Sequence, residues 1–462
     1  MTELTVFEQW MSRESASFEK RTPASARMFK KAQTRLPGGD TRTVTFFNPY
    51  PAFVQRGEGC KLIDIDGNSY LDFLNNYTVL IHGHAHPAIV QAVKTQLEKG
   101  TCFAGPTESQ HTLAELICER VKSVEQIRFC NSGTEATLNA IRAARIISGK
   151  SMVVKMEGGY HGSHDLAEVS ITPNLTSAGP IEKPNSVPQS AGIPNSVLSE
   201  VIVVPFNNRK ATEDLIRRYK DEIACVIVEP VLGVAGVIPP EDGYLQLLRD
   251  LTTELNKILI FDEVVTFRLA LGGAQSIYQV HPDITAFGKT IGGGLPIGAF
   301  GGSKEIMKVF SPLEKKYASQ SGTFNANPLS MVAGIACLKQ LTSEVIEHIN
   351  SLGILLRKGM DLALSRVGIR GMATGVGSLT MTHINKALVR DYRSASQGNF
   401  QALLLIHMRL LEKGVYVPPR GGEYSISSAM DEGHINTLLA AFEESLIEVK
   451  PFIEQTSPEL II

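Results

Sequence analysis

The sequence has little of what marks several large classes of protein. Its 45 Lys and Arg residues are balanced by 47 Asp and Glu, which leaves no basic excess for binding nucleic acid or an acidic membrane. No apolar run approaches the roughly 18 residues that a membrane span needs. The polar, mixed-charge stretch from Met1 to Lys20 does not have the pattern of a signal peptide. We therefore expect neither nucleic-acid nor membrane partners.

Cysteine is scarce as well, and its spacing has no pattern. The six cysteines show no CxxC or other metal-ligand spacing, so we expect buried free thiols in a reducing compartment. The tract His82-Gly83-His84-Ala85-His86 has no acidic or cysteine ligand beside it, and no metal is predicted there. The interpretation is a cytoplasmic enzyme without a resident metal ion.

What the sequence does contain is enough apolar residues for a large core. Its 462 residues are 43% hydrophobic, which excludes disorder as the main state. Through the middle of the chain, short apolar runs such as 152–156, 224–228 and 258–261 alternate with helical stretches. Continuous apolar strands between helices predict a mostly parallel sheet covered on both faces. The predicted fold class is α/β.

The two ends of the chain differ from this middle region. Residues 1–35 have helical spacing, and residues 52–73 have the short apolar segments and the Asp-Gly turn of hairpins. Helices and short strands are mixed again near the C-terminus. We predict an N-terminal lobe over 1–75, a large domain over 76–330 and a C-terminal small domain over 331–462.

A phosphate site is one interpretation of the run Asn-Ser-Gly-Thr-Glu-Ala at 131–136. The run lies where an apolar stretch turns into a helix, so it offers free backbone N–H groups, two hydroxyls and the positive end of the helix dipole. An ordinary N-cap would have the same sequence. Two nucleotide motifs are missing: there is no GxxxxGK[ST], and the run at 292–297 fails GxGxxG because it ends in Ile297. A P-loop protein is therefore excluded, and a dehydrogenase is disfavoured.

Two residues at predicted strand ends could carry chemistry. Asp262 ends the apolar run 258–261, and Lys289 follows the apolar run 284–287 and precedes a glycine cluster. Ligands of α/β enzymes bind at the carboxyl edge of the sheet. The pair fits a Schiff-base lysine with a carboxylate that anchors a heterocycle, and the alternative is a salt bridge between neighbouring strands. Tyr160 and His161, flanked by glycines, would form a platform for a planar ring.

Together these residues give the chain a resemblance to pyridoxal-phosphate (PLP) enzymes of fold type I. More narrowly it resembles the class III aminotransferases, which include glutamate-1-semialdehyde aminomutase and the β-amino-acid aminotransferases. The resemblance extends from about residue 36 to residue 428. The motifs that carry it, in the family's order, are His84-Ala85-His86-Pro87, Gly105-Pro106-Thr107-Glu108, the run 131–136, Gly159-Tyr160-His161-Gly162, Val228-Glu229-Pro230-Val231, Phe261-Asp262-Glu263-Val264, Gly288-Lys289, and Gly322-Thr323-Phe324-Asn325.

The resemblance implies a fold, a cofactor and a set of roles. The fold would be a large domain with a mostly parallel sheet, plus a small α+β domain built from the N- and C-terminal segments. Lys289 would hold PLP as an internal aldimine and act as acid and base, Asp262 would keep the pyridine nitrogen protonated, and Tyr160 would stack on the ring. The other cofactor-binding residues would be Ser132, Gly133, Thr134, His161, Glu229, Val264 and Thr323.

The resemblance also implies an assembly and a mobile element. Thr323 matches the family residue that reaches the phosphate of the partner subunit, so a homodimer with shared active sites is expected. The segment 172–197, which contains five prolines, interrupts the large domain. It would then be a candidate lid, and the alternative is a simple surface excursion.

The substrate is predicted from arginines. Arg42 in Thr41-Arg42-Thr43 and Arg420 in a Pro-Pro-Arg-Gly-Gly run resemble residues of the β-amino-acid aminotransferases, and the segment from Val264 to Arg268 is one residue shorter than in the aminomutases. Guanidinium binds carboxylate bidentately and keeps its charge. Arg268 is a third candidate, and each arginine could instead form a surface ion pair or serve packing.

The leading prediction is transfer of an amino group from a β-amino acid to an oxo acid such as 2-oxoglutarate. The alternatives are a glutamate-1-semialdehyde 2,1-aminomutase-like isomerase, or a PLP epimerase of the same family. From a different class, a binding homologue that has lost its chemistry is disfavoured because Lys289 is present.

Overall fold

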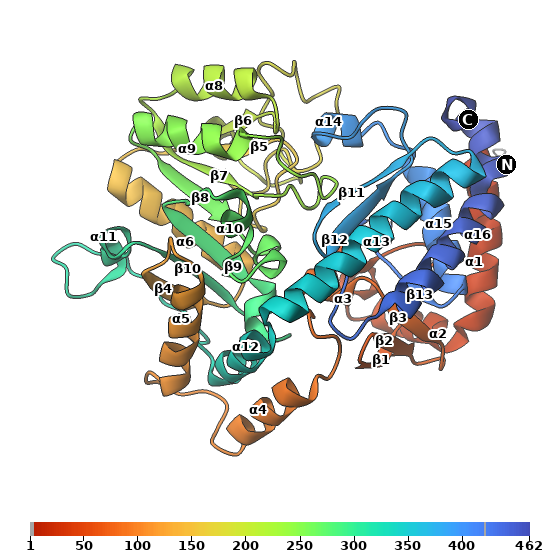
Figure 1. Cartoon of the computed structure of the whole chain (residues 1–462), viewed down its shortest axis with the longest axis horizontal. Helices are drawn as coiled ribbons and strands as arrows, with labels where there is room; N and C mark the ends of the chain where they lie inside the picture. The colour runs from red at the N-terminus through yellow and green to blue at the C-terminus, as the bar shows by residue number, and fades with distance from the viewer. Residues whose placement is uncertain (1–3, 420–421) are drawn as a thin grey trace. The chain divides into compact units, whose positions relative to one another are not determined.

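The computed structural model describes residues 4–419 and 422–462, and Arg420 therefore lies outside the described residues. The chain forms two compact units, and Figure 1 labels most of their elements. Unit 1 comprises Met1–His86, His348–Val389 and Gln397–Ile462, so it combines both ends of the chain. Unit 2 comprises Pro87–Glu347 and the short segment Arg390–Ser396.

The core of unit 2 is a sheet of seven described strands in the order β4-β10-β9-β8-β7-β5-β6. Every strand is parallel except β10, which is antiparallel to both of its neighbours. The predicted mostly parallel sheet is thus confirmed. The bounds are β4 (Gln126–Cys130), β5 (Met152–Met156), β6 (Val201–Val204), β7 (Ile223–Val228), β8 (Ile258–Asp262), β9 (Ile284–Gly288) and β10 (Gly298–Gly302).

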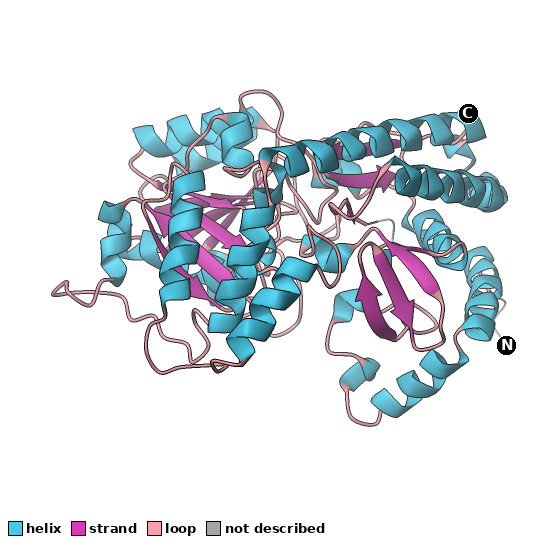
Figure 2. Cartoon of the chain, turned by 60° about the horizontal axis from the view of Figure 1, so that its bottom comes forward, coloured by secondary structure: helices cyan, strands magenta, loops and turns pink. Residues whose placement is uncertain are grey.

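Helices flank this sheet, as Figure 2 shows. Every residue of the interior strand β7 is buried, as expected for a strand covered on both faces. Helix α6 begins where Ser132 caps it and ends at Gly149 (φ 65°), and its buried alanines let it lie close to the sheet. The helices of unit 2 are α4 (Pro87–Leu97), α5 (Glu108–Arg120), α6 (Gly133–Ser148), α7 (Asn195–Ser199), α8 (Arg209–Arg218), α9 (Tyr244–Glu254), α10 (Ala274–Tyr278), α11 (Lys304–Met307), α12 (Pro328–Gln340) and α14 (Tyr392–Ala395).

Unit 1 contains two small sheets and the terminal helices. One sheet has the order β1-β2-β3-β13 and the other the order β11-β12-β14. The parallel pairing of β13 with β3 joins residues near 415 to residues near 71, which ties the two ends of the chain together. The strands are β1 (Val54–Glu58), β2 (Lys61–Asp64), β3 (Ser69–Asp72), β11 (Met372–Val376), β12 (Leu379–His383), β13 (Val415–Tyr416) and β14 (Tyr424–Ser425).

The helices of unit 1 cover these sheets and pack on one another. Helix α1 packs against α15 and α16, and Phe452 of α16 contacts the rings of Phe7 and Trp10. The boundary between the two units falls within α13 (Ser343–Val367). The other helices are α1 (Val6–Arg21), α2 (Pro23–Ala32), α3 (Asn75–Thr78), α15 (Phe400–Glu412) and α16 (Glu432–Thr456).

The described cysteines and long helices test two further expectations. All six cysteines are free thiols, but Cys102 is exposed and Cys118 is half-buried, so the prediction of six buried thiols is wrong for these two. Over the described ranges, no single helix is long and apolar enough to span a membrane. Only α12 and α13 taken together meet that length and composition, and they are bent by 77°.

Candidate active site

The carboxyl edge of the unit 2 sheet gathers most of the predicted residues. Asp262 is the last residue of β8, and Lys289 follows directly after the neighbouring strand β9. Glu229 follows β7, and the turn 157–161 follows β5. Ser132 lies just after β4 and begins α6. Parallel strands present their carboxyl ends at one edge, where α/β enzymes bind ligands.

Asp262 is a buried carboxylate with a fixed orientation. Its side chain is 5% exposed, and its Oδ2 lies 2.9 Å from Nδ1 of His161. Its Oδ1 accepts a hydrogen bond from the Val264 N–H at 3.1 Å. Burial lowers the pKa of His161, although its hydrogen bond with Asp262 acts in the opposite direction. A neutral imidazole that donates from Nδ1 matches a carboxylate oxygen that accepts.

His161 is itself held from its backbone. Its carbonyl accepts a hydrogen bond from Oγ1 of Thr137 on α6, at 2.6 Å. Its Nε2 is buried and makes no hydrogen bond with the described residues. The structure places the His161 ring against Asp262, and its contact with the cofactor stays a prediction.

Glu229 fixes the backbone beside Tyr160. Its Oε1 accepts from the Tyr160 N–H at 2.9 Å, and its Oε2 accepts from the Gly233 N–H at 3.2 Å. Burial, together with the nearby Asp262 carboxylate, raises the pKa of Glu229 to about 8. The Tyr160 residue that it supports is 41% exposed, so the platform predicted from the sequence is accessible to a ligand.

The turn at the start of α6 is closely packed on glycines. Ser132 caps α6, and its Oγ accepts from the Glu135 N–H at 3.2 Å, so the N-cap interpretation of this run is correct. Its hydroxyl proton remains available for a ligand. A Cβ on Gly298 of β10 would lie 1.9 Å from the Ser132 carbonyl oxygen, so only glycine lets the strand pass this turn. A Cβ on Gly162 would lie 2.6 Å from Oγ1 of Thr134.

Lys289 has a backbone conformation that is uncommon for a residue with a side chain. Its φ is 49°, in the left-handed region, and it is half-buried. Such conformations in non-glycine residues concentrate at functional sites. Gly288 and Gly133 both face Val264: a Cβ on either would lie 3.0 to 3.2 Å from its methyl groups. Val264 therefore packs between the strand end that carries Lys289 and the start of α6.

Glu263, the neighbour of Asp262, has a structural role that the sequence does not reveal. Its carboxylate is fully buried and accepts from the N–H groups of Ala274 and Gln275, at 2.7 and 2.9 Å. The hydroxyl of Thr266 also donates to it. Burial raises the pKa of Glu263. Adjacent acids thus face opposite sides of the strand, and only Asp262 belongs to the candidate site.

Lys155 is a second residue that the sequence interpretation missed. It lies within β5, is fully buried, and its Nζ donates to the Gly159 carbonyl at 2.9 Å and to the Val169 carbonyl. Burial lowers the pKa of Lys155 to about 7. The only sequence signal is a lysine in an otherwise apolar run, which marks a cation that must find partners in the core.

In unit 1, Arg42 is held by a strained turn. Its Nη1 donates to Oδ1 of Asn76 at 2.8 Å, and its guanidinium carbon lies 4.9 Å from the centre of the Tyr77 ring. The Tyr77 hydroxyl donates to the Val44 carbonyl. The four residues Asn75–Thr78 all have φ between 48° and 73°. Successive left-handed residues without glycine are costly, which points to a functional reason.

The other two arginine candidates for binding a substrate carboxylate are Arg268 and Arg420. Arg268 is fully buried within the short helical turn Thr266–Leu269, which favours the packing role. Arg420 lies outside the described residues. Arg42 is thus the one exposed candidate in the part of the chain that the structure covers.

Thr323 lies on an exposed part of unit 2, beside the segment 101–103. The Thr323 carbonyl is 3.9 Å from Sγ of Cys102, and Nδ2 of Asn327 donates to the Thr101 carbonyl at 3.0 Å. Phe103 and Phe324 on these two segments are 49% and 60% exposed. Two large aromatic side chains are therefore exposed on neighbouring segments.

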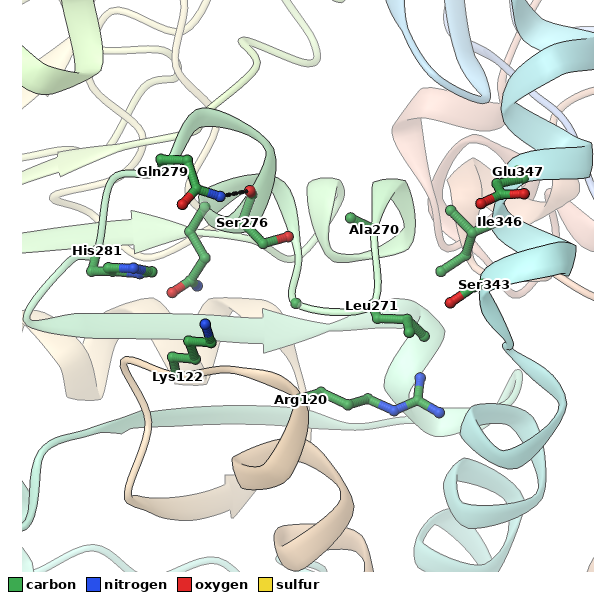
Figure 3. Close-up of a pocket in the computed structure, with 12 residues that line it drawn as sticks. Arg120, Lys122, Ala270, Leu271, Ser276, Gln279, His281, Ser343, Ile346 and Glu347 are labelled. Carbon is green, nitrogen blue, oxygen red and sulfur yellow. Dashed lines mark hydrogen bonds between the residues drawn. The ribbon is translucent and has the colours of Figure 1, made fainter.

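A separate pocket of about 400 Å³ contains none of the predicted residues. Figure 3 shows Arg120 and Lys122 on one side of it, with Ser343 and Glu347 near the start of α13 on another. Nothing at this pocket matches the strand-edge cluster. The candidate active site is therefore the carboxyl edge of the sheet.

Comparison with known proteins gives a family match over most of the chain. The family model described as Aminotransferase class-III matches residues 46–428. A glutamate-1-semialdehyde 2,1-aminomutase of Methanothermobacter thermautotrophicus is 43% identical over 92% of this chain and 99% of its own length.

Solved structures with a similar fold carry transaminase names. An omega-transaminase from Sphaerobacter thermophilus is 42% identical (TM-score 0.87, 92% of this chain and 98% of that one). A transaminase with PLP bound is 36% identical (TM-score 0.85, 93% and 99%). A β-phenylalanine aminotransferase from Variovorax paradoxus is 33% identical (TM-score 0.88, 96% and 99%).

Proposed function

We propose that this chain, which belongs to the class-III aminotransferase family of PLP-dependent enzymes, transfers an amino group of a carboxylate-bearing substrate with PLP held at Lys289. The fold type I architecture of the family agrees with the seven-stranded sheet of unit 2. The observation that carries the assignment of residues is the buried Asp262 carboxylate, fixed by His161 at the strand edge next to Lys289.

The residues at this edge fit PLP. A buried carboxylate suits the protonated pyridine nitrogen, and the start of α6 with Ser132, Gly133 and Thr134 suits the phosphate. The exposed ring of Tyr160 suits the face of the cofactor. When bound, PLP supplies an electron sink for the carbanion formed next to the transferred nitrogen.

The chain's own groups would then divide the work. The Lys289 amine, on a left-handed residue at the strand end, would hold the cofactor and move the proton between the substrate carbon and the cofactor side. Asp262 would keep a proton on the pyridine nitrogen, and His161 would keep the Asp262 carboxylate oriented. Glu229 would hold the Tyr160 backbone in place.

The test of this assignment is a Lys289→Ala substitution. With PLP, the wild-type protein should acquire a visible absorption band that dialysis removes only slowly. The Lys289→Ala variant should show neither this lysine-linked absorption nor turnover. Retention of both by Lys289→Ala would overturn the assignment of the lysine.

Isomerisation of a glutamate-1-semialdehyde-type substrate is the reaction that the curated relatives favour. The first of them, at 43% and 41% identity, both carry the aminomutase name. This support reverses the order suggested by the sequence, in which β-amino-acid transamination came first. An aminomutase needs no added oxo acid, because the amino group returns to the same carbon skeleton.

Transamination of a β-amino acid is the second candidate, and one observation in unit 1 supports it. Arg42 is held by Asn76 and Tyr77 on a strained turn, a costly arrangement that suits recognition of a substrate carboxylate. The solved relatives named as an omega-transaminase and a β-phenylalanine aminotransferase add support.

One assay separates the two reactions. Holoenzyme is incubated with glutamate-1-semialdehyde alone, and separately with 3-amino-3-phenylpropanoate or β-alanine, with and without 2-oxoglutarate. Conversion of the semialdehyde without an oxo acid supports the aminomutase. Consumption of a β-amino acid that strictly requires the oxo acid supports the aminotransferase, and failure of all substrates would contradict both.

A homodimer with shared active sites forms part of the proposal. Its support is the exposed position of Thr323, whose carbonyl lies 3.9 Å from Sγ of Cys102, next to the exposed Phe103 and Phe324 along the chain. Light scattering should give twice the mass of one chain. Mixing Thr323→Ala with Lys289→Ala chains should restore about a quarter of wild-type activity at limiting PLP. About half of the dimers are then mixed, and each mixed dimer has one intact site of its two. A monomeric mass, or no restoration, would contradict shared sites.

We place the protein in the cytoplasm on the basis of its thiols. All described cysteines are free, which a reducing compartment maintains. Cell fractionation with an antibody tests this location, and recovery from an oxidising compartment would contradict it.

A further inference from the structure

Glu157 begins the turn that carries Tyr160, and it is a buried charge. Its carboxylate is 2% exposed, immediately after β5. Arg393 makes the only ion pair that Glu157 forms among the described residues, with Nε and Nη2 donating to the two carboxylate oxygens at 2.7 and 2.9 Å. A bidentate pair of this kind fixes both side chains.

The same guanidinium holds a second segment. Nη1 of Arg393 donates to the Gly179 carbonyl at 2.8 Å, and Nη2 also donates to the Ala178 carbonyl at 3.3 Å. Both carbonyls belong to residues 170–187, which we call the 170–187 loop and which includes most of the proline-rich segment. Arg393 therefore bridges this loop and the turn at the end of β5.

The neck of the 170–187 loop is fastened to the same turn. The Ser170 N–H donates to the Val187 carbonyl at 2.7 Å, which closes the loop. The Gly158 N–H then donates to the Ser170 carbonyl at 2.9 Å. Lys155 adds a further link, because its Nζ donates both to the Gly159 carbonyl in the turn and to the Val169 carbonyl just before the loop. The loop and the turn are thus one hydrogen-bonded body.

Tyr392, next to Arg393, packs on both parts of this body. Its hydroxyl donates to the Pro173 carbonyl at 2.7 Å. A Cβ on Gly158 (φ 86°) would lie 2.7 Å from Cβ of Tyr392, so the turn passes directly against this residue. Only glycine satisfies both the positive φ and the close approach here.

The segment Arg390–Ser396 that supplies these side chains is anchored within unit 2. It belongs to unit 2 although unit 1 residues precede and follow it along the chain. Its Arg390 carbonyl accepts from Nδ2 of Asn207 at 2.8 Å, and Asp391 caps the short helix α14 by accepting from the Ser394 N–H. The segment is therefore a fixed support.

We infer that Arg390–Ser396 is a clamp that joins the 170–187 loop to the turn 157–161, and that Arg393 is a positioning residue for Tyr160 and His161. Removing the guanidinium would leave the Glu157 carboxylate buried without its cation and would free the loop carbonyls. The turn would then lose the support that sets the Tyr160 ring. The role for the cofactor rests on the proposed function, whereas the fastening of the loop does not.

Two measurements on the full-length holoenzyme test the clamp. Hydrogen–deuterium exchange in Arg393→Ala should become at least about tenfold faster over residues 170–187. The dissociation constant for PLP should rise about tenfold, and the circular dichroism of the bound cofactor should change sign or shrink because Tyr160 no longer holds the ring. A residue that served general stability alone would not alter the cofactor signal of the folded protein.

Three variants make the test specific. Arg390→Ala is the matched control, because its side chain is 61% exposed and lies 3.8 Å from Glu241. Arg393→Lys keeps the charge but cannot reach both the carboxylate and the two carbonyls, so it should restore the PLP affinity only in part. Glu157→Gln removes the carboxylate and carries the test if Arg393→Ala does not fold.

The outcomes separate this inference from the proposed function. Exchange over 170–187 in Arg393→Ala that equals that of Arg390→Ala would overturn the clamp. Faster exchange with an unchanged cofactor signal and PLP affinity would overturn the positioning role. A wild-type protein that binds no PLP would overturn the proposed function, while the exchange comparison would still decide whether the clamp exists.

Discussion

The strand-edge cluster of unit 2 and the Arg42 turn of unit 1 use opposite means to hold a charged side chain. Asp262 and Glu229 are buried, and each accepts two hydrogen bonds from groups on the sheet or on the turns beside it. Arg42 is exposed and is held by one amide oxygen and one aromatic face. The cluster is fixed by the fold, whereas Arg42 depends on a local turn.

Under the proposed function, this difference separates the residues of the chemical step from those of substrate recognition. Removing one partner from a buried charged pair costs about 3 to 5 kcal/mol, so residues of the cluster can hardly change without loss of function. Exposed charged contacts contribute about 0.2 to 1 kcal/mol each, so an exposed side chain such as Arg42 can be replaced with little loss in the stability of the fold. Relatives that share the cluster can therefore act on different substrates.

The adjacent acids Asp262 and Glu263 provide the strongest test of the cluster. Asp262→Asn should lower kcat by about 10³-fold or more, because a neutral amide does not keep the pyridine nitrogen protonated. Its amide oxygen can still accept from Nδ1 of His161, so the loss of stability should be smaller than for removal of the whole side chain. Glu263→Gln should leave kcat nearly unchanged but lower the free energy of unfolding by about 2 to 3 kcal/mol. The amide group of the glutamine would face the buried donors that Glu263 now accepts from and leave one of them without an acceptor. Steady-state kinetics and urea unfolding measure the two effects. Equal effects of the two variants on kcat would contradict the division of roles.

Arg42 tests the other side of the comparison. Arg42→Ala should raise KM for the substrate about 10- to 100-fold with kcat changed little, since a hydrogen-bonded charge contributes about 1.5 to 3 kcal/mol. Arg42→Lys should lie between, because an ammonium cannot bind a carboxylate bidentately. A fall in kcat with unchanged KM would place Arg42 in the chemical step and would contradict its role in substrate recognition.

The raised pKa of Glu229 predicts a pH dependence of stability. Burial raises that pKa to about 8 in the folded state, above the ordinary value of 4.5 in the unfolded chain. Between these values the folded protein binds the proton more tightly, so this group lowers the free energy of unfolding as the pH rises from about 5 to 8. Urea unfolding of cofactor-free protein at several pH values should show this fall in the wild type and a smaller fall in Glu229→Gln. Parallel curves for the two proteins would contradict it.

The sequence predicts the cluster better than its supports, for a physical reason. Asp262 and Lys289 lie at the ends of short apolar runs, so a local pattern locates them on the sheet edge. The Arg393–Glu157 pair joins residues 236 positions apart, and no local pattern marks it. Lys155 appears in the sequence only as a lysine in an apolar strand, and its carbonyl partners come from a turn and a loop.

The strained turn beside Arg42 could not be predicted either. Glycine is the main signal for left-handed conformations; Asn75 and Asn76 tolerate them, but nothing in the sequence marks Tyr77 and Thr78. The hairpins of residues 54–72, by contrast, can be predicted from Gly59 and from the Asp66-Gly67 turn. Gly59 has a φ of 53° and Gly67 a φ of 88°. Conformations that depend on tertiary contacts escape a local interpretation, while those that depend on residue type do not.

Tyr77 gives the smallest expected effect and the finest test of the comparison. Tyr77→Leu keeps bulk beside Arg42 but removes the aromatic face and the hydroxyl that donates to the Val44 carbonyl. A cation–π contact at an exposed site contributes about 0.5 to 1 kcal/mol, so KM should rise about 2- to 5-fold. Tyr77→Phe keeps the ring and should show less than half of this change. Because both variants leave the buried cluster intact, PLP affinity should equal that of the wild type, and a loss of PLP affinity would show that the Arg42 turn supports the cofactor rather than the substrate.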